Sequence, residues 1–164
     1  MTIERDLERI ALQEERLCFD VFDAETAWEL GCRLKATAEA RGVAVTIEVR
    51  LAREPVFLVA MRGVTPSNAD WARRKRNLVE FLGHSSYAEG LSLKAEGSSL
   101  EAKYGLPLRD YANHGGCFPI RVRGVGFVGT VTVSGLPQRD DHALVVEVLA
   151  AMCGVPLAEV ALDV

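Results

Sequence analysis

One glycine-rich stretch, from His114 to Gly135, constrains the fold more than any other part of the sequence, because it carries six of the fourteen glycines. Its segments Cys117–Arg123 and Phe127–Ser134 are rich in β-branched and aromatic residues, and Gly124-Val125-Gly126 separates them. Two β-prone runs around a short glycine turn predict a β-hairpin. The loop His114-Gly115-Gly116 leads into this hairpin.

Amphipathic and capping patterns predict four helices. They are expected over residues 2–16, between the N-cap Asp23 and Gly42, after Thr65-Pro66, and after Asp140 or Asp141 as N-cap. Residues 88–112 show no pattern for a long element. Residues 154–164 are expected to form a tail of mixed apolar character that a partner subunit could bury.

A second hairpin is predicted before the middle helix. Val43–Leu51 alternates between apolar and polar residues, so one face belongs to the core and the other is wet or lies under an interface. Val56–Met61 is apolar on both faces, which predicts a more central strand paired with the first. Two hairpins joined by helices predict an α+β fold, an antiparallel sheet in a single two- or three-layer domain over residues 1–164.

Composition places the chain among soluble globular proteins, with 49% hydrophobic and 26% charged residues. A net charge of −4 gives no general attraction to nucleic acid or to an acidic membrane. No apolar run reaches the roughly 18 residues that span a bilayer, and the N-terminus does not have the order of a signal peptide. We therefore expect a cytoplasmic protein with neither a nucleic-acid nor a membrane partner.

Two motifs that suggest chemistry are better explained by structure. Gly124-x-Gly126-x-x-Gly129 matches a dinucleotide-binding pattern, but a β sequence follows it where that pattern needs a helix. The basic run Arg73–Arg76 is more typical of a solvated helix face than of a phosphate site. The four cysteines form no Cys-x-x-Cys pair, so neither a zinc ribbon nor a dithiol redox pair is expected.

Candidate functional residues gather around the three histidines. His114 precedes Gly115 and Gly116, which allow the loop to expose backbone N–H groups to a ligand. His142 follows Asp141, whose carboxylate could orient the imidazole. The competing interpretation gives His142 a role in the capping turn and gives the other histidines structural hydrogen bonds.

Two further positions complete the candidate set. His84 lies beside Ser85 at the end of the middle helix, and the histidine spacings carry no metal-ligand signature. Lys75 lies inside the apolar stripe of that helix. Its side chain either extends over the core with the amine in water or points into a polar pocket at a subunit junction. No metal site is predicted.

The motifs also resemble a known family. His114-Gly-Gly-Cys-Phe-Pro-Ile120, Gly124-Val-Gly-Phe-Val-Gly-Thr-Val-Thr-Val-Ser-Gly135 and Asp140-Asp-His142 are similar to segments of the haem-degrading-domain superfamily, the HbpS/GlcG-like proteins. Ala27–Gly31, Trp71-x-x-x-Lys75 and Gly83–Ser86 add to the resemblance, which is closest to a short cytosolic branch of the superfamily.

The resemblance implies a profilin-like, roughly five-stranded antiparallel sheet flanked by helices in three layers, assembled into homo-oligomers. Some members of the superfamily bind haem or other tetrapyrroles, so haem is a possible cofactor by resemblance only. His84 and His114 are then the candidate iron ligands, because imidazole is a usual ligand of haem iron.

Three functions remain open from the sequence. The first is an oligomeric small-molecule-binding protein, with haem or a related tetrapyrrole as the candidate ligand implied by the resemblance. Its site would be formed by Lys75, His84, Ser85, His114, Gly115, Gly116, Asp141 and His142. The second is an enzyme in which Lys75 or His114 acts as acid or base on a small polar or anionic substrate. The third is an assembly or adaptor protein without catalytic activity.

Overall fold

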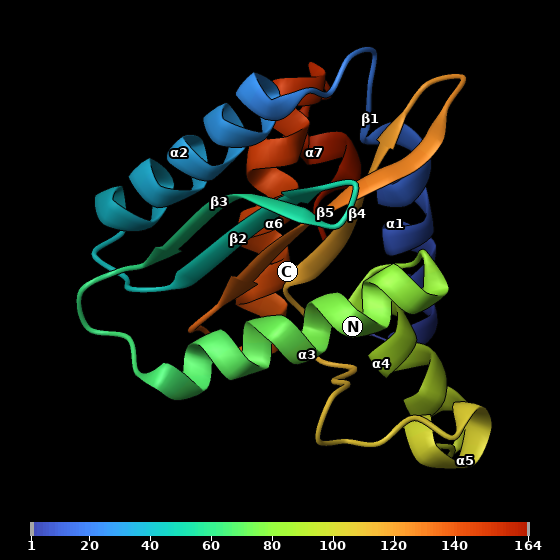
Figure 1. Cartoon of the computed structure of the whole chain (residues 1–164). Coiled ribbons are helices and arrows are strands. Elements are labelled where there is room, and N and C mark those ends of the chain that lie inside the picture. The colour runs from blue at the N-terminus through green and yellow to red at the C-terminus, as the bar shows by residue number, and fades with distance from the viewer. Residues whose placement is uncertain (1, 164) are drawn as a thin grey trace.

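The computed structural model describes residues 2–163 (Figure 1). Its elements follow in the order α1 (Ile3–Arg16), β1 (Cys18–Phe19), α2 (Ala24–Ala40), β2 (Thr46–Leu51), β3 (Glu54–Ala60), α3 (Pro66–Leu82), α4 (Ser86–Glu96), α5 (Leu100–Tyr104), β4 (Cys117–Val122), β5 (Gly126–Ser134), α6 (Gln138–Cys153) and α7 (Leu157–Val160). Both predicted hairpins and all four predicted helices are present. The α+β class is confirmed.

The five strands form one sheet in the order β1-β4-β5-β2-β3. Four of them pair antiparallel, as predicted, with Val131 of β5 opposite both Val49 of β2 and Phe118 of β4. The two-residue strand β1 lies parallel to β4, with Cys18 opposite Arg121. The sheet is therefore mixed: β1 and β4 form a parallel pair, and the other neighbouring strands are antiparallel.

The prediction that Val56–Met61 forms a central strand is wrong. This segment contributes β3, which is the edge of the sheet, and the central strand is β5. Phe57 packs under α2, whereas the next residue, Leu58, points to the opposite face and is 64% exposed. The apolar residues of β3 therefore lie on two different faces. One face is buried under α2, and the other is not covered. The predicted homo-oligomer stays a prediction.

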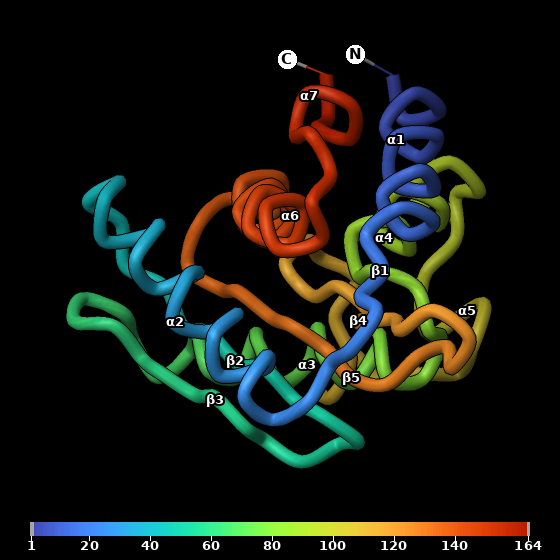
Figure 2. The backbone as a smooth tube through the Cα atoms, turned by 90° about the horizontal axis from the view of Figure 1, so that it is seen from above, coloured from blue at the N-terminus to red at the C-terminus, as the bar shows by residue number. Residues whose placement is uncertain are grey.

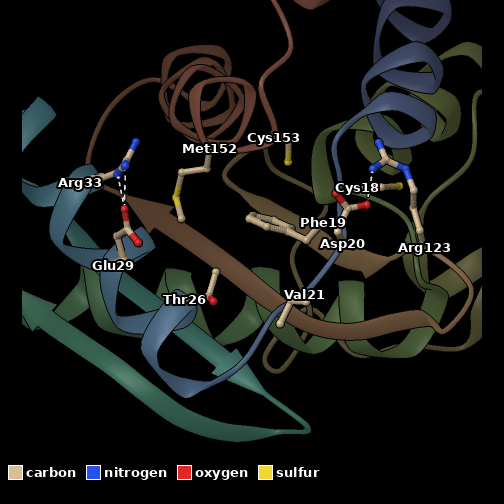
Figure 3. Close-up of a pocket in the computed structure, with 10 residues that line it drawn as sticks. All are labelled: Cys18, Phe19, Asp20, Val21, Thr26, Glu29, Arg33, Arg123, Met152 and Cys153. Carbon is tan, nitrogen blue, oxygen red and sulfur yellow. Dashed lines mark hydrogen bonds and ion pairs between the residues drawn. The ribbon is translucent and has the colours of Figure 1, made fainter.

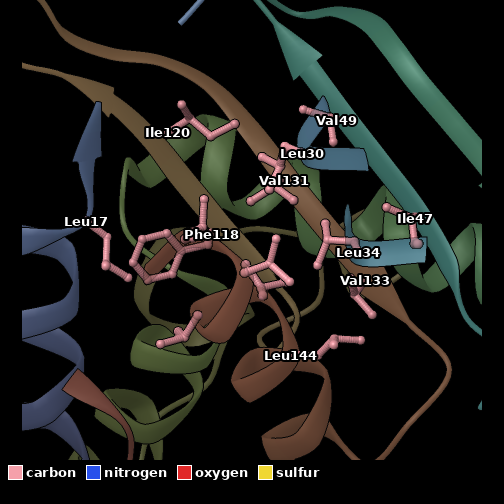
Figure 4. Close-up of a cluster of buried hydrophobic side chains, with 14 of the residues drawn as sticks. Leu17, Leu30, Leu34, Ile47, Val49, Phe118, Ile120, Val131, Val133 and Leu144 are labelled. Atoms are coloured by element: carbon pink, nitrogen blue, oxygen red, sulfur yellow. The ribbon is translucent and has the colours of Figure 1, made fainter. Parts of the chain in front are cut away.

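Helices cover both faces of the sheet and make three layers (Figure 1). Alternate residues of β2 and β5 meet Leu30 and Leu34 of α2 and Leu144 of α6 in the main core (Figure 4). The opposite face, predicted to be wet or under an interface, lies under α3 instead. There Arg76 of α3 donates to Glu48 of β2 at 2.8 Å.

Two segments without a predicted long element are helical. Ser85 accepts a hydrogen bond from the Ala88 N–H at 3.2 Å and begins α4, and Gly97 ends it in the left-handed conformation. The expected tail carries α7, which packs against α1 of the same chain (Figure 2). Gln13 of α1 donates to the Val160 carbonyl at 2.7 Å, and the Val160 side chain is fully buried.

The close contact between α2 and β3 generates a stability prediction. A Cβ on Gly31 would lie 2.1 Å from Cγ of the Phe57 ring. Gly31→Ala should therefore lower the free energy of unfolding by about 1–3 kcal/mol, although alanine favours a helix by about 1 kcal/mol. Chemical denaturation measures this change. Phe57→Leu in the same background should recover part of the loss, and a Gly31→Ala variant as stable as wild type would contradict the packing described.

Candidate functional site

A cavity of about 240 Å³ lies where the first turns of α3 and α6 meet the His114 loop and the end of β5. We call it the Lys75 cavity, and the residues that give it its chemistry are Trp71, Lys75, His114, Ser134, Gln138 and Asp141. Three residues predicted from the sequence therefore line one recess: Lys75, His114 and Asp141.

A buried ion pair forms the inner wall of the Lys75 cavity. Lys75 is 3% exposed and Asp141 is 1% exposed. The Lys75 Nζ donates to Asp141 Oδ2 at 2.9 Å and to the Val133 carbonyl at 3.2 Å. Lys75 thus does not extend its amine into water. It points into a polar pocket, and residues of a single chain line this pocket.

Asp141 does not cap α6. The helix begins at Gln138 with Pro137 as its N-cap, and Asp141 lies one turn inside. Its Oδ1 accepts the Leu136 N–H at 2.9 Å and its Oδ2 accepts the Gly135 N–H at 3.4 Å. Burial raises the pKa of the Asp141 carboxyl, while Lys75 and the two backbone donors oppose that rise.

The two glycines after His114 allow close backbone contact. A Cβ on Gly116 would lie 2.3 Å from the Val133 carbonyl oxygen and 2.8 Å from the Lys75 Nζ, and its φ of +132° also favours glycine. The Gly115 N–H donates to Gln138 Oε1 at 3.2 Å. The prediction that this loop offers its N–H groups to a ligand is therefore wrong for Gly115, because the Gly115 N–H already donates to Gln138.

His114 lies at the rim of the Lys75 cavity. Its ring meets the Trp71 ring edge-on, with centroids 4.9 Å apart. Partial burial lowers the pKa of His114, and the positive charges of Lys75 and Arg74 lower it further. The imidazole is therefore mainly neutral at pH 7, and a neutral imidazole has a nitrogen lone pair that can bind a metal or a proton.

His142 is close to the cavity in sequence but not in structure. It is buried between the Tyr87 and Phe118 rings, and its Nε2 is 2.8 Å from Gln13 Oε1. The Gln13 amide nitrogen donates to a carbonyl, so its oxygen must accept from the His142 Nε2–H. Asp141 therefore does not orient His142, contrary to expectation. Burial lowers the pKa of His142 to about 3.

His84 and Ser85 also lie away from the Lys75 cavity. The His84 side chain is 63% exposed, and its Nδ1 is 2.9 Å from Glu14 Oε2 on α1. The Ser85 N–H donates to the other oxygen of Glu14 at 2.7 Å. Both residues thus attach α1 to the start of α4. The three imidazoles have separate partners, and of these only His114 lines the Lys75 cavity.

Ser134 and Gln138 line the Lys75 cavity but were not predicted from the sequence. Gln138 lies three positions before Asp141 on the same face of α6, but the predicted helix began only after Asp140 or Asp141, so Gln138 was outside it. Ser134 gave no signal beyond its place at the end of a strand. The basic run is held by partners within the chain: Arg73 pairs with Asp110 at 2.9 Å, and Arg76 pairs with Glu48.

A larger cavity of about 310 Å³ lies at the opposite end of α6, near Cys18 and Cys153 (Figure 3). Its two guanidinium groups are each paired with a carboxylate, Arg33 with Glu29 and Arg123 with Asp20. Burial raises the pKa of the Cys153 thiol to about 11, which keeps it protonated and unreactive. This cavity is larger than the Lys75 cavity, but its charged groups are already paired and its Cys153 thiol is unreactive, so the Lys75 cavity is the better candidate site.

Two absences among residues 2–163 bear on function. These residues contain no group of three or more His, Cys, Asp or Glu side chains placed to hold a metal ion. In the same residues no helix combines the length and the apolar character that crossing a membrane requires.

Comparison with known proteins gives consistent matches. Residues 22–150 match the family described as "Haem degrading protein HbpS-like". A UPF0303 protein of Azotobacter vinelandii (strain DJ) is 60% identical over 163 residues, which cover 99% of this chain and 98% of that protein. The crystal structure of the Ybr137w protein is similar at 27% identity with a TM-score of 0.82, covering 90% of this chain and 87% of that one. The fold is also shared with the crystal structure of a PduOC:heme complex, at 16% identity and a TM-score of 0.64, over 76% of this chain and 91% of that one.

The buried pair generates a prediction about stability. Lys75→Met removes the partner of a buried carboxylate and should lower the free energy of unfolding by about 3–5 kcal/mol. The double variant Lys75→Met with Asp141→Leu removes both charges and should be considerably more stable than Lys75→Met alone. Urea denaturation of the single and double variants measures the difference. Equal stability of wild type and Lys75→Met would show that the pair is not buried.

His142 generates a prediction about pH. The folded protein keeps His142 neutral down to about pH 3, whereas the unfolded chain protonates a histidine near its ordinary pKa of 6.5. Stability is therefore fully present above pH 6.5 and is lost as the pH falls. Between pH 7 and pH 5 the His142 contribution is about 2 kcal/mol. Denaturation curves at both pH values should show a smaller loss of stability for His142→Phe than for the wild-type protein. An equal loss in wild type and His142→Phe would rule out the buried neutral imidazole.

Proposed function

The chain belongs to the HbpS-like family of haem degrading proteins, and from this premise we propose that it binds a small molecule at the Lys75 cavity, with haem held at the rim by His114. One observation carries the proposal: the exposed, neutral imidazole of His114 lies at the mouth of a cavity whose inner wall holds a buried ion pair. Charged groups held in fixed positions at the wall of an open cavity can orient a polar ligand.

The residues at the rim fit haem as a ligand. In the described part of the chain no hydrogen bond to either ring nitrogen of His114 is present, so the imidazole would be able to ligate the haem iron. Trp71 offers an apolar ring beside it, and the Arg74 guanidinium lies 4.4 Å from the centre of that ring. A cation in this place could pair with the carboxylates of haem. Haem bound here would supply an iron centre for ligand or redox chemistry.

The size of the Lys75 cavity sets which ligands enter it. Sites that enclose drug-sized ligands have volumes of roughly 300–1,000 Å³, whereas this cavity has about 240 Å³. A tetrapyrrole would therefore be held mainly outside, at the rim. The role of the chain's own residues is to present a neutral imidazole, to orient it against Trp71 and to place a cation beside it.

Titration with hemin tests the proposal. Wild type should shift the Soret band, and His114→Ala should bind hemin at least about tenfold more weakly, because the imidazole that would ligate the iron is lost. His84→Ala is the matched control, since His84 is also an exposed imidazole but lies outside the cavity and pairs with Glu14. It should bind like wild type. A spectrum of free hemin with wild-type protein, or equal losses in both variants, would contradict binding through His114.

A further inference from the structure

The ammonium group of Lys75 has an unused donor. Its three N–H groups face two acceptors among residues 2–163, Asp141 Oδ2 and the Val133 carbonyl. A buried donor without an acceptor costs free energy, and Lys75 is also one of the residues that line the cavity. The third N–H therefore marks the place where a ligand atom would be accommodated beside Nζ.

Gly116 leaves room beside the amine, because it has no side chain. A side chain at position 116 would begin 2.8 Å from Nζ, which is closer than any nonbonded carbon approaches. The other lysines of the chain, Lys35, Lys94 and Lys103, are not placed in this way, and Lys35 and Lys103 pair with surface carboxylates. Lys75 thus differs from them in burial, in fixed geometry and in access to a cavity.

We propose that Lys75 is a nucleophilic amine that forms an iminium bond with a small aldehyde or ketone in the Lys75 cavity. The ion pair has no net charge, so it does not attract an anion, and Asp141 repels one. The other polar side chains that line the cavity are neutral: Asn68, His114, Ser134 and Gln138. A small neutral carbonyl compound is the ligand class that matches this lining and this volume.

The ion pair can supply every proton that the reaction needs. Asp141 takes a proton from the Lys75 ammonium, and the neutral amine then forms a C–N bond to the carbonyl carbon. The carbonyl π electrons move to the oxygen, which receives a proton from Asp141, while the amine nitrogen returns one, giving a carbinolamine. A second proton from Asp141 releases the oxygen as water and leaves the iminium.

Charge is conserved in the buried pair throughout this sequence. The starting pair is an ammonium facing a carboxylate, and the product is an iminium facing the same carboxylate. No unpaired buried charge is created, and such a charge would cost several kcal/mol. The raised pKa of Asp141 agrees with a carboxyl that can hold a proton for part of the cycle.

This inference does not depend on haem. Hemin binding is read at His114 on the rim, whereas iminium formation is read at Lys75 on the inner wall. Either experiment can fail while the other succeeds, so the two failures are distinguishable.

Reductive trapping tests the inference with the four lysines as internal competitors. The protein is incubated with glycolaldehyde and cyanoborohydride at pH 7, and the modified lysines are located by peptide mass spectrometry. Exposed lysines are almost fully protonated at this pH and react slowly. Lys75 should be alkylated about tenfold faster than the other three, because its proton can pass to Asp141. The α-amino group has a lower pKa than a lysine and reacts for that reason, so only the lysines are compared.

A structural role for Lys75 predicts the reverse order, because a buried amine in a permanent ion pair is the least accessible of the four. Alkylation of the three surface lysines with Lys75 unmodified would therefore overturn the inference. Lys75→Arg keeps a cation opposite Asp141 but forms no iminium, so it should lose the fast adduct while its circular dichroism stays that of wild type. Should that variant not fold, the order of the lysines in wild type decides alone.

Discussion

The structure around the site depends on one interaction, the ion pair that Lys75 of α3 makes with Asp141 of α6. These two helices lie on opposite faces of the sheet, and the pair joins them at the end of β5. Two buried charges are tolerated only when each is neutralised and hydrogen bonded. The Val133 carbonyl accepts a hydrogen bond from Lys75, and the N–H groups of Gly135 and Leu136 donate to Asp141. The turn between β5 and α6 is thereby fixed.

The same requirement explains the glycines around the pair. Backbone can approach Nζ and the Val133 carbonyl only where position 116 lacks a side chain. The His114 loop then lies directly against α6, through the bond from the Gly115 N–H to Gln138. His114 itself is carried to the rim beside Trp71. The Lys75 cavity is the space left between α3, α6, the His114 loop and the end of β5.

Local patterns predicted the parts of the fold that depend on local physics. The Asp23 cap and the stripe Ala27, Leu30, Leu34, Ala38 were correct because N-cap geometry and helix periodicity lie within a few residues. The edge position of β3 was not predictable, since strand order depends on pairing between distant segments. The helix α4 was missed because Gly90 lowers its helix propensity, and that glycine is required by contact with the Asn113 carbonyl in a distant loop.

The candidate site shows the same division. Lys75, His114 and Asp141 were recognised as chemical groups, but the partner of Asp141 was assigned to its neighbour His142. Successive residues of a helix point about 100° apart, so Asp141 faces the cavity while His142 faces Gln13. The true partner is 66 positions away and becomes visible only when α3 and α6 are placed together.

The measurement that tests the central claim most directly is a correlation of lysine Nζ with its attached protons by NMR, in protein labelled with ¹⁵N-lysine. Exposed ammonium protons exchange with water too fast to give sharp signals at pH 7, whereas a buried and hydrogen-bonded ammonium exchanges slowly. The account predicts one persistent signal, which Lys75→Arg removes. The absence of any persistent signal in the wild-type protein, or its survival in Lys75→Arg, would contradict it.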